Sequence, residues 1–191
     1  ENNSWLFEFP SLPKGRFNSV CFVYRDSLYV FGGTDNSSNM NEIVRYDLST
    51  QNSGEWTTIA KVNEANQRGG VAFVVEDKVY AGLGEKSNGI RNGFYVSSDS
   101  LTKWELIPSI PAQLGVISSG VYDEQKKSFF MIDNDGKIWE YNLTTEQWTS
   151  RSLWIRMKNY HMFMLDGSIY ILGQDIYQKN KFTVYNPIWD N

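Results

Sequence analysis

The chain has 191 residues and a formal net charge of −4 at pH 7, and it contains only one histidine and one cysteine. This length suits one domain or one repeat array. One cysteine and one histidine exclude a disulfide within the chain and a zinc site of several Cys and His ligands. We expect no metal and no other cofactor. The acidic balance argues against a nucleic-acid partner, and no run of 18 or more apolar residues is present that would predict a membrane-spanning helix.

Aromatic residues are unusually frequent and make up 15% of the chain. Trp56, Trp104 and Trp148 lie 48 and 44 residues apart, and each follows a tyrosine that closes a short apolar run. Self-similarity at a period of about 40–50 residues is typical of propellers and other repeat folds. The tryptophans therefore predict a repeated structural unit.

Each unit contains two apolar runs joined by a polar turn, then a longer loop and two further short runs. The first runs cover residues 20–24, 71–75, 117–122 and 160–165. The second runs cover residues 28–33, 79–84, 129–133 and 169–173, after turns at residues 25–27, 76–78, 123–127 and 166–167. Because the runs are short, rich in Val, Ile, Tyr and Phe, and without helical periodicity, each unit predicts antiparallel strands.

Four-stranded units of this length predict an all-β fold, a β-propeller of about four blades. The expected repeats cover residues 14–62, 66–111, 113–153 and 156–189 of a single domain. Large flat side chains would fill the wedge between neighbouring sheets, which gives the aromatic residues a structural role. Cys21 lies within an apolar run, so we expect it to be a buried small residue.

The repeats resemble Kelch repeats, in which an arginine opens the first strand, a double glycine ends the second, a tyrosine ends the third and a tryptophan starts the fourth. The first repeat matches throughout, with Arg16, residues 29–33, residues 46–47 and Trp56. The later repeats keep part of the pattern: Arg68, Tyr80, Gly82, Gly84, Tyr95 and Trp104, then Tyr141 and Trp148, then Arg156, Tyr170, Gly173 and Tyr185. The resemblance covers nearly the whole chain and implies a Kelch-type propeller.

The sequence leaves the closure of the ring open. The fourth repeat has three expected strands, and residues 4–13 look like an orphan fourth strand similar to residues 104–111. Pairing of this segment with residues 182–185 would close a four-bladed ring and cover exposed strand edges. Alternatively the chain is a slice of a larger ring, which Trp189 favours because a strand from the N-terminal segment would make it redundant. We therefore expect either a monomer or a ring-completing partner.

The longest loops are predicted to share one face of the propeller, where the second-to-third and fourth-to-first connections lie. They cover residues 34–41, 85–93 and 174–181. Loops on a rigid scaffold often carry binding residues, although simple solvated loops have the same composition. The resemblance to Kelch repeats implies a non-enzymatic module that recognises a protein or a glycan through this face. The candidate ligand-binding residues are Asn36, Asn39, Asn88, Arg91, Asn92, Asp175 and Tyr177.

A carbohydrate-active enzyme, such as a sugar-acid mutarotase or epimerase, is the alternative function. The Kelch superfamily includes sialic-acid mutarotases, and this resemblance implies catalytic roles for Arg16, Arg68 and His161 if they converge near the axial channel. The arginines at strand starts, including Arg156, could hold a carboxylate through their planar donors. They could equally bond backbone carbonyls as part of the repeat pattern, and His161 could be a core residue.

Asp133 and Asp135 flank Asn134 and precede Gly136, a spacing that calcium loops share. The downstream glutamate that completes such a loop is not convincingly placed. We therefore expect a tight turn at this position rather than a metal site.

The Asn- and Ser-rich loops, the start without Met and the lone cysteine favour a secreted or cell-envelope protein, in the periplasm or at the cell surface. A cytoplasmic location is the alternative.

Overall fold

The computed structural model describes residues 10–89, 91–98, 100–154, 156–175 and 177–186. They form four antiparallel sheets, each built from strands that are consecutive in the chain. The first sheet contains β1 (Val20–Tyr24), β2 (Ser27–Phe31), β3 (Glu42–Asp47) and β4 (Thr57–Lys61). The second contains β5 (Val71–Val75), β6 (Lys78–Gly82), β7 (Phe94–Ser98) and β8 (Glu105–Leu106).

The remaining two sheets follow the same order. The third contains β9 (Ile117–Asp123), β10 (Ser128–Asp133), β11 (Lys137–Asn142) and β12 (Gln147–Trp154). The fourth contains β13 (Lys158–Leu165), β14 (Ser168–Gln174) and β15 (Asn180–Tyr185). Two short 3-10 helices, η1 (Leu48–Ser53) and η2 (Asn63–Ala65), flank β4. In the part of the chain that the structure describes, no helix is long and apolar enough to cross a membrane.

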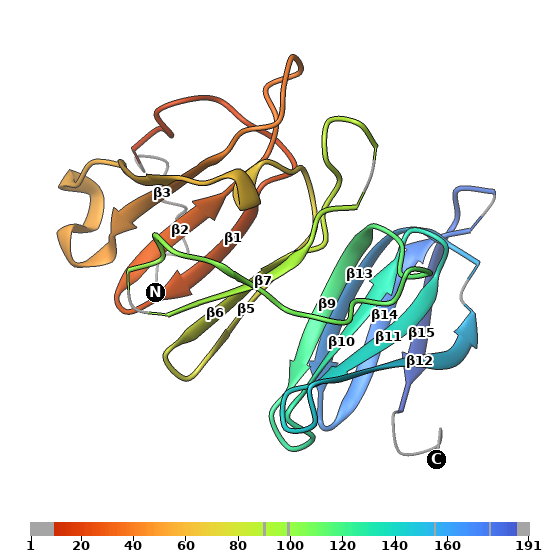
Figure 1. Cartoon of the computed structure of the whole chain (residues 1–191). Helices are drawn as coiled ribbons and strands as arrows, with labels where there is room; N and C mark the ends of the chain where they lie inside the picture. Colours follow the sequence, from red (N-terminus) through yellow and green to blue (C-terminus); the bar gives the residue numbers. More distant parts are fainter. Residues whose placement is uncertain (1–9, 90, 99, 155, 176, 187–191) are drawn as a thin grey trace, which may run out of the picture.

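The first strands of successive sheets lie side by side, β1 against β5, β5 against β9 and β9 against β13. In Figure 1 the sheets follow one another from the first, in red and orange, to the fourth, in blue on the opposite side of the molecule. This arrangement is that of β-propeller blades, with the first strand of each blade innermost, and it confirms the predicted fold class.

Tight turns set the register of the innermost strand pairs. Arg25 and Asp26 both have positive φ, 44° and 47°, between β1 and β2. Asp166 and Gly167, with φ of 48° and 72°, occupy the same place between β13 and β14. Two successive residues with positive φ match the twist of antiparallel strands, so these turns fix which side chains face each neighbouring blade.

The hydrophobic core is divided among the blade interfaces. One cluster joins the first two blades around Phe22, Phe31 and Val79. A second joins the middle blades, where the rings of Phe73 and Phe129 stack with centroids 4.2 Å apart and planes within 11°. A third cluster joins the last two blades. The aromatic excess therefore serves sheet-on-sheet packing, as the sequence predicts.

The strand expected in residues 4–13 falls largely outside the described residues, as does Trp189. The first described residue, Pro10, accepts a hydrogen bond from the indole nitrogen of Trp56 in the first blade, at 2.8 Å. Within the described ranges β15 is the last strand of its sheet, and Phe182 and Val184 on it are exposed. The predicted pairing with residues 182–185 stays a prediction.

Candidate functional site

A cavity of about 660 Å³ lies where the first strands of all four blades begin. Each blade contributes to its lining, and the polar contributors are Asn18, Arg68, Glu85, Ser118, Asn134, Asn159 and His161. It lies on the face that carries the second-to-third and fourth-to-first loops. We call it the blade-start cavity.

Backbone hydrogen bonds between neighbouring blades build the frame of this cavity. The Gly69 nitrogen donates to the Asn18 carbonyl at 2.7 Å, and the Ile117 nitrogen donates to the Leu83 carbonyl at 2.9 Å. Because these bonds join the first blade to the second and the second to the third, the cavity has a rigid backbone lining.

Arg68 and Glu85 form the charged pair of the cavity. The two residues face each other in an antiparallel bridge, and the guanidinium donates to both carboxylate oxygens, at 2.9 and 3.2 Å. This contact with Glu85 raises the pKa of Arg68 above its ordinary value. The bidentate pairing neutralises the arginine within the site, so its charge is already matched before any ligand arrives.

Two asparagines occupy equivalent positions just ahead of Val20 in the first blade and His161 in the fourth. Asn18 and Asn159 have φ of 53° and 56°, a left-handed conformation that asparagine tolerates better than most residues. The Asn159 amide nitrogen donates to the side-chain oxygen of Gln174 at 3.1 Å. Both asparagines line the cavity, where amide groups offer donors and acceptors without charge.

The third blade adds a hydroxyl and an amide. The Ser118 hydroxyl donates to the Asn134 side-chain oxygen at 2.5 Å. Asn134 sits in a turn organised by buried Asp133, whose carboxylate accepts from the Asp135 and Lys137 nitrogens at 3.0 Å each. The Gly136 nitrogen also donates to the Asp133 carbonyl at 2.9 Å, which closes a tight turn and confirms the turn predicted at this position. Among the described residues, no three His, Cys, Asp or Glu side chains are grouped to hold a metal.

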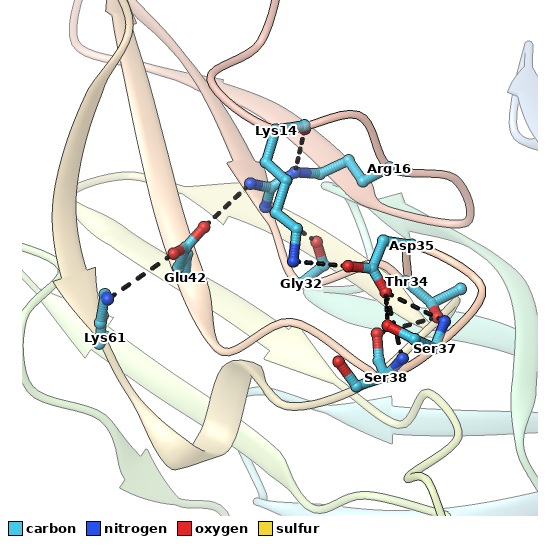
Figure 2. A network of polar contacts seen from close by, with 9 residues as sticks. All are labelled: Lys14, Arg16, Gly32, Thr34, Asp35, Ser37, Ser38, Glu42 and Lys61. Carbon is cyan, nitrogen blue, oxygen red and sulfur yellow. Dashed lines mark hydrogen bonds and ion pairs between the residues drawn. The ribbon is translucent and has the colours of Figure 1, made fainter.

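The three residues of the alternative enzyme do not all reach the cavity. Arg68 and His161 line it, whereas Arg16 does not. The Arg16 side chain is 1% exposed and donates to the Gly32 carbonyl at 3.2 Å and to the Glu42 carboxylate at 3.1 Å. Figure 2 shows this pair, with Lys61 on the far side of Glu42. The structural role expected for strand-start arginines therefore holds for Arg16.

A one-residue offset separates the two arginines. Phe17 forms the isolated bridge ahead of β1, and Arg68 forms the corresponding bridge ahead of β5. The residue equivalent to Arg16 is therefore Gln67, which is fully buried and accepts from the Gly84 nitrogen at 3.2 Å. The expected alignment of Arg16 with Arg68 is wrong, because successive residues of an extended chain point to opposite sides. Arg156 is exposed and does not line the cavity either.

Residues 34–41 form an ordered loop beside the cavity. The Asp35 carboxylate pairs with Lys14 at 2.5 Å and accepts from the Ser37 and Ser38 nitrogens at 3.1 Å each (Figure 2). Lys14 and these donors hold the pKa of Asp35 well below its usual range. Asn36 is exposed at the tip with φ of 78°. Asn39 donates to the Glu85 carbonyl at 2.9 Å and so ties the loop to the second blade.

The predicted binding residues of the second loop divide into two kinds. Asn88 is exposed. Arg91 donates to the Leu114 carbonyl at 2.9 Å. Asn92 is 1% exposed, and its amide nitrogen donates to the Glu64 carbonyl at 2.7 Å. Arg91 and Asn92 therefore hold the loop in place, and burial leaves Asn92 no surface for a ligand.

The third loop stands apart from the cavity. The Asp175 carboxylate accepts from the Tyr177 and Lys179 nitrogens at 2.9 Å each, and Tyr177 is 75% exposed. Neither Asp175 nor Tyr177 lines the blade-start cavity.

Sequence reasoning missed most of the cavity. Asn18, Asn159, Ser118 and Asn134 were not expected as site residues. Asn18 and Asn159 had a detectable signal, because both stand two residues before equivalent positions of their first strands, Val20 and His161. Ser118 and Asn134 had none, since a register shift between β9 and β10 brings them together.

Comparisons with known proteins agree with this architecture. A Kelch motif model matches residues 15–63, which cover the first blade. The solved structure of YjhT matches with a TM-score of 0.66 at 10% sequence identity, covering 92% of this chain and 67% of that one. No curated protein sequence matches the chain. The sheets define a four-bladed β-propeller. The Kelch motif in the first blade and the four-bladed architecture together support a Kelch-repeat propeller.

Proposed function

We propose that the protein is a non-enzymatic binding module that recognises a protein or glycan partner through its loop face, with the blade-start cavity taking a neutral polar group. The observation that carries this proposal is the bidentate pairing of Arg68 with Glu85. Because that pair cancels its own charge, the remaining polar groups are amides, a hydroxyl and His161. Such groups suit sugar hydroxyls and peptide groups.

The sugar-acid enzyme has weaker support. It requires Arg16, Arg68 and His161 around one carboxylate, but Arg16 is engaged with Glu42 inside the first blade. Arg68 would have to leave Glu85 to bind an acidic sugar, and an uncovered Glu85 would repel it. A secreted or cell-envelope location is proposed from composition alone.

The binding proposal is tested on an array of neutral and acidic glycans, followed by titration calorimetry with the best-retained compound. We expect retention of neutral compounds. Asn159→Gly removes an amide from the cavity while glycine keeps the left-handed backbone, so affinity should fall about fivefold, the loss of one hydrogen bond of about 1 kcal/mol.

Lys127→Gly is the control, because it also replaces an exposed left-handed residue by glycine, in the turn between β9 and β10 at the opposite end of the blade. It should leave affinity unchanged. Retention of acidic glycans alone, or a loss only in Lys127→Gly, would overturn the proposal. So would accelerated anomer exchange of a sugar acid that disappears in Arg68→Ala.

A further inference from the structure

One face of the fourth blade is apolar and exposed. Paired residues of antiparallel strands point to the same side, so the pairs that join β13, β14 and β15 place several large side chains together. The exposed members are Phe163, Leu165, Leu172, Phe182 and Val184, with half-buried Tyr170 between them. We call this surface the forward face of the fourth blade. A cluster of this kind is unusual on a protein surface that contacts only water.

The forward face of the fourth blade repeats one that is buried in the first. Phe163 pairs with Tyr170 as Phe22 pairs with Tyr29. The first two rings stack at 5.2 Å and 9°, and the second two at 5.3 Å and 8°. Phe22 and Tyr29 are each 8% exposed because the second blade covers them, whereas Phe163 is 40% exposed. The exposed face therefore has the geometry of an internal blade interface.

The surface of the second blade that packs against Phe22, Tyr29 and their neighbours combines small aliphatic residues with Leu101 and Trp104. In the second blade, β5 and β6 supply Ala72, Val74, Val79 and Ala81 to this contact. The equivalent residues on β1 and β2 are Cys21, Val23, Leu28 and Val30. We call this set the rear face of the first blade.

The rear face of the first blade is partly exposed. Val23 is 55% exposed and Cys21 is exposed, whereas Leu28 is half-buried and Val30 is buried. The expectation of a buried cysteine is therefore wrong. In the second blade the equivalent residue, Ala72, is covered because it packs against the first blade, whereas Cys21 lies on the side of the first blade that faces away from the second. The chain thus carries the aromatic half of such an interface on the fourth blade, and on the first blade the equivalent of the small aliphatic part of the other half.

We propose that two copies of the chain associate head to tail, with the forward face of each fourth blade packed on the rear face of the partner's first blade. This contact continues the interface that already joins the first and second blades. If two such contacts are related by a two-fold axis, the two copies form a closed ring of eight blades, within the range of about 4–8 blades that propellers adopt. The inference concerns assembly and is independent of the proposed ligand.

Sedimentation velocity between about 1 and 100 µM tests the proposal, at concentrations that span weak and moderate dimers. The expected species has twice the 22.0 kDa mass of the chain. Phe163→Asp and Val23→Asp each place a charge in the contact and should abolish the dimer. Leu106→Asp is the matched control, because Leu106 is 59% exposed on β8, the outer strand of the second blade. It should leave the dimer intact.

Mixing separates the head-to-tail arrangement from other dimers. Phe163→Asp keeps a normal rear face and Val23→Asp keeps a normal forward face, so an equimolar mixture should recover a dimer through one contact. Recovery also shows that both variants are folded. Cys21 is the single cysteine, so its labelling by a maleimide should be slower in the wild-type dimer than in either variant.

Three results would overturn the proposal. A wild-type monomer at the highest concentration would leave the forward face to a different partner, such as a shorter segment of blades. A dimer that survives Val23→Asp would indicate two forward faces packed on each other. A mixture of the two variants that stays monomeric, with circular dichroism showing both folded, would exclude the complementary contact.

Discussion

The first and second blades use an arginine differently at the loop face. Arg16 in the first blade has 1% of its side chain exposed and is held by Glu42, whereas Arg68 in the second has 44% exposed and lines the cavity beside Glu85. Both arginines pair with a glutamate in their own blade. The difference is one residue of register, which turns the side chain from the interior to the cavity. A similar residue in a similar motif therefore has a structural role in one blade and a place in the site in the next.

The largest effect that this comparison predicts is on stability, from Arg16→Met. The substitution leaves the Gly32 carbonyl and the Glu42 carboxylate without their guanidinium donor. The Arg16 side chain is buried while Glu42 is partly exposed and also faces Lys61, so we expect the free energy of unfolding to fall by about 3 kcal/mol, the low end for breaking a buried pair from one side. Urea denaturation followed by tryptophan fluorescence measures it. A fall below about 0.5 kcal/mol, the level of ordinary surface substitutions, would mean that Arg16 is not structural.

A somewhat smaller loss is expected from Gln67→Leu. Gln67 is the second-blade equivalent of Arg16, and its side-chain oxygen accepts from the Gly84 nitrogen and from the Asn92 amide at 3.2 and 3.0 Å. Leucine has a similar size but no acceptor, so two buried donors lose a partner at a cost of about 2 kcal/mol. The same urea titration applies. An unchanged urea midpoint would show that Gln67, unlike Arg16, does not contribute to the stability of its blade.

Arg68→Met should leave the urea midpoint unchanged within error. Its ion pair with Glu85 is substantially exposed to solvent, and such pairs contribute little to stability. The substitution uncovers the Glu85 carboxylate, so acidic glycans should be retained less on the array than by the wild type. A loss of stability as large as that of Arg16→Met would show that Arg68 is also structural, and would contradict the different roles assigned to the two arginines.

A small effect on stability that depends on pH is expected in the loop of the first blade. Lys14, then the Ser37 and Ser38 donors, lower the pKa of Asp35, so the carboxylate stabilises the folded state above the unfolded-state pKa of about 4. That contribution is lost as the pH falls toward the lower folded-state pKa. Asp35→Asn should therefore lower the urea midpoint at pH 7, with a difference from wild type that shrinks toward pH 2. A difference that grows in acid would contradict this sign.

The fold was predictable because every blade repeats the same local pattern. The first strands expected at residues 20–24 and 71–75 coincide with β1 and β5, and a period-two strand between tight turns leaves little freedom. The pattern marks where strands lie, and it also assigns the aromatic residues to the blade interfaces.

The cavity was less predictable because it depends on details that the pattern does not contain. Arg68 enters it through a one-residue offset from Arg16, and Ser118 meets Asn134 only because the register shifts between β9 and β10. Asn92 shows the opposite case. It was predicted to bind a ligand, but it is buried because its amide nitrogen donates to the Glu64 carbonyl. Loop composition alone could not separate these cases.

The single histidine allows the most direct test of the central claim that ligands bind in the blade-start cavity. His161 lines the cavity and is the only histidine of the chain, so its ring signals in an NMR spectrum report on that site without assignment of the others. Addition of the neutral glycan best retained on the array should shift the His161 signals in the wild type and in the control Lys127→Gly. In Asn159→Gly the same shift should need about fivefold more glycan. Saturable binding that leaves the His161 signals unmoved would contradict the account.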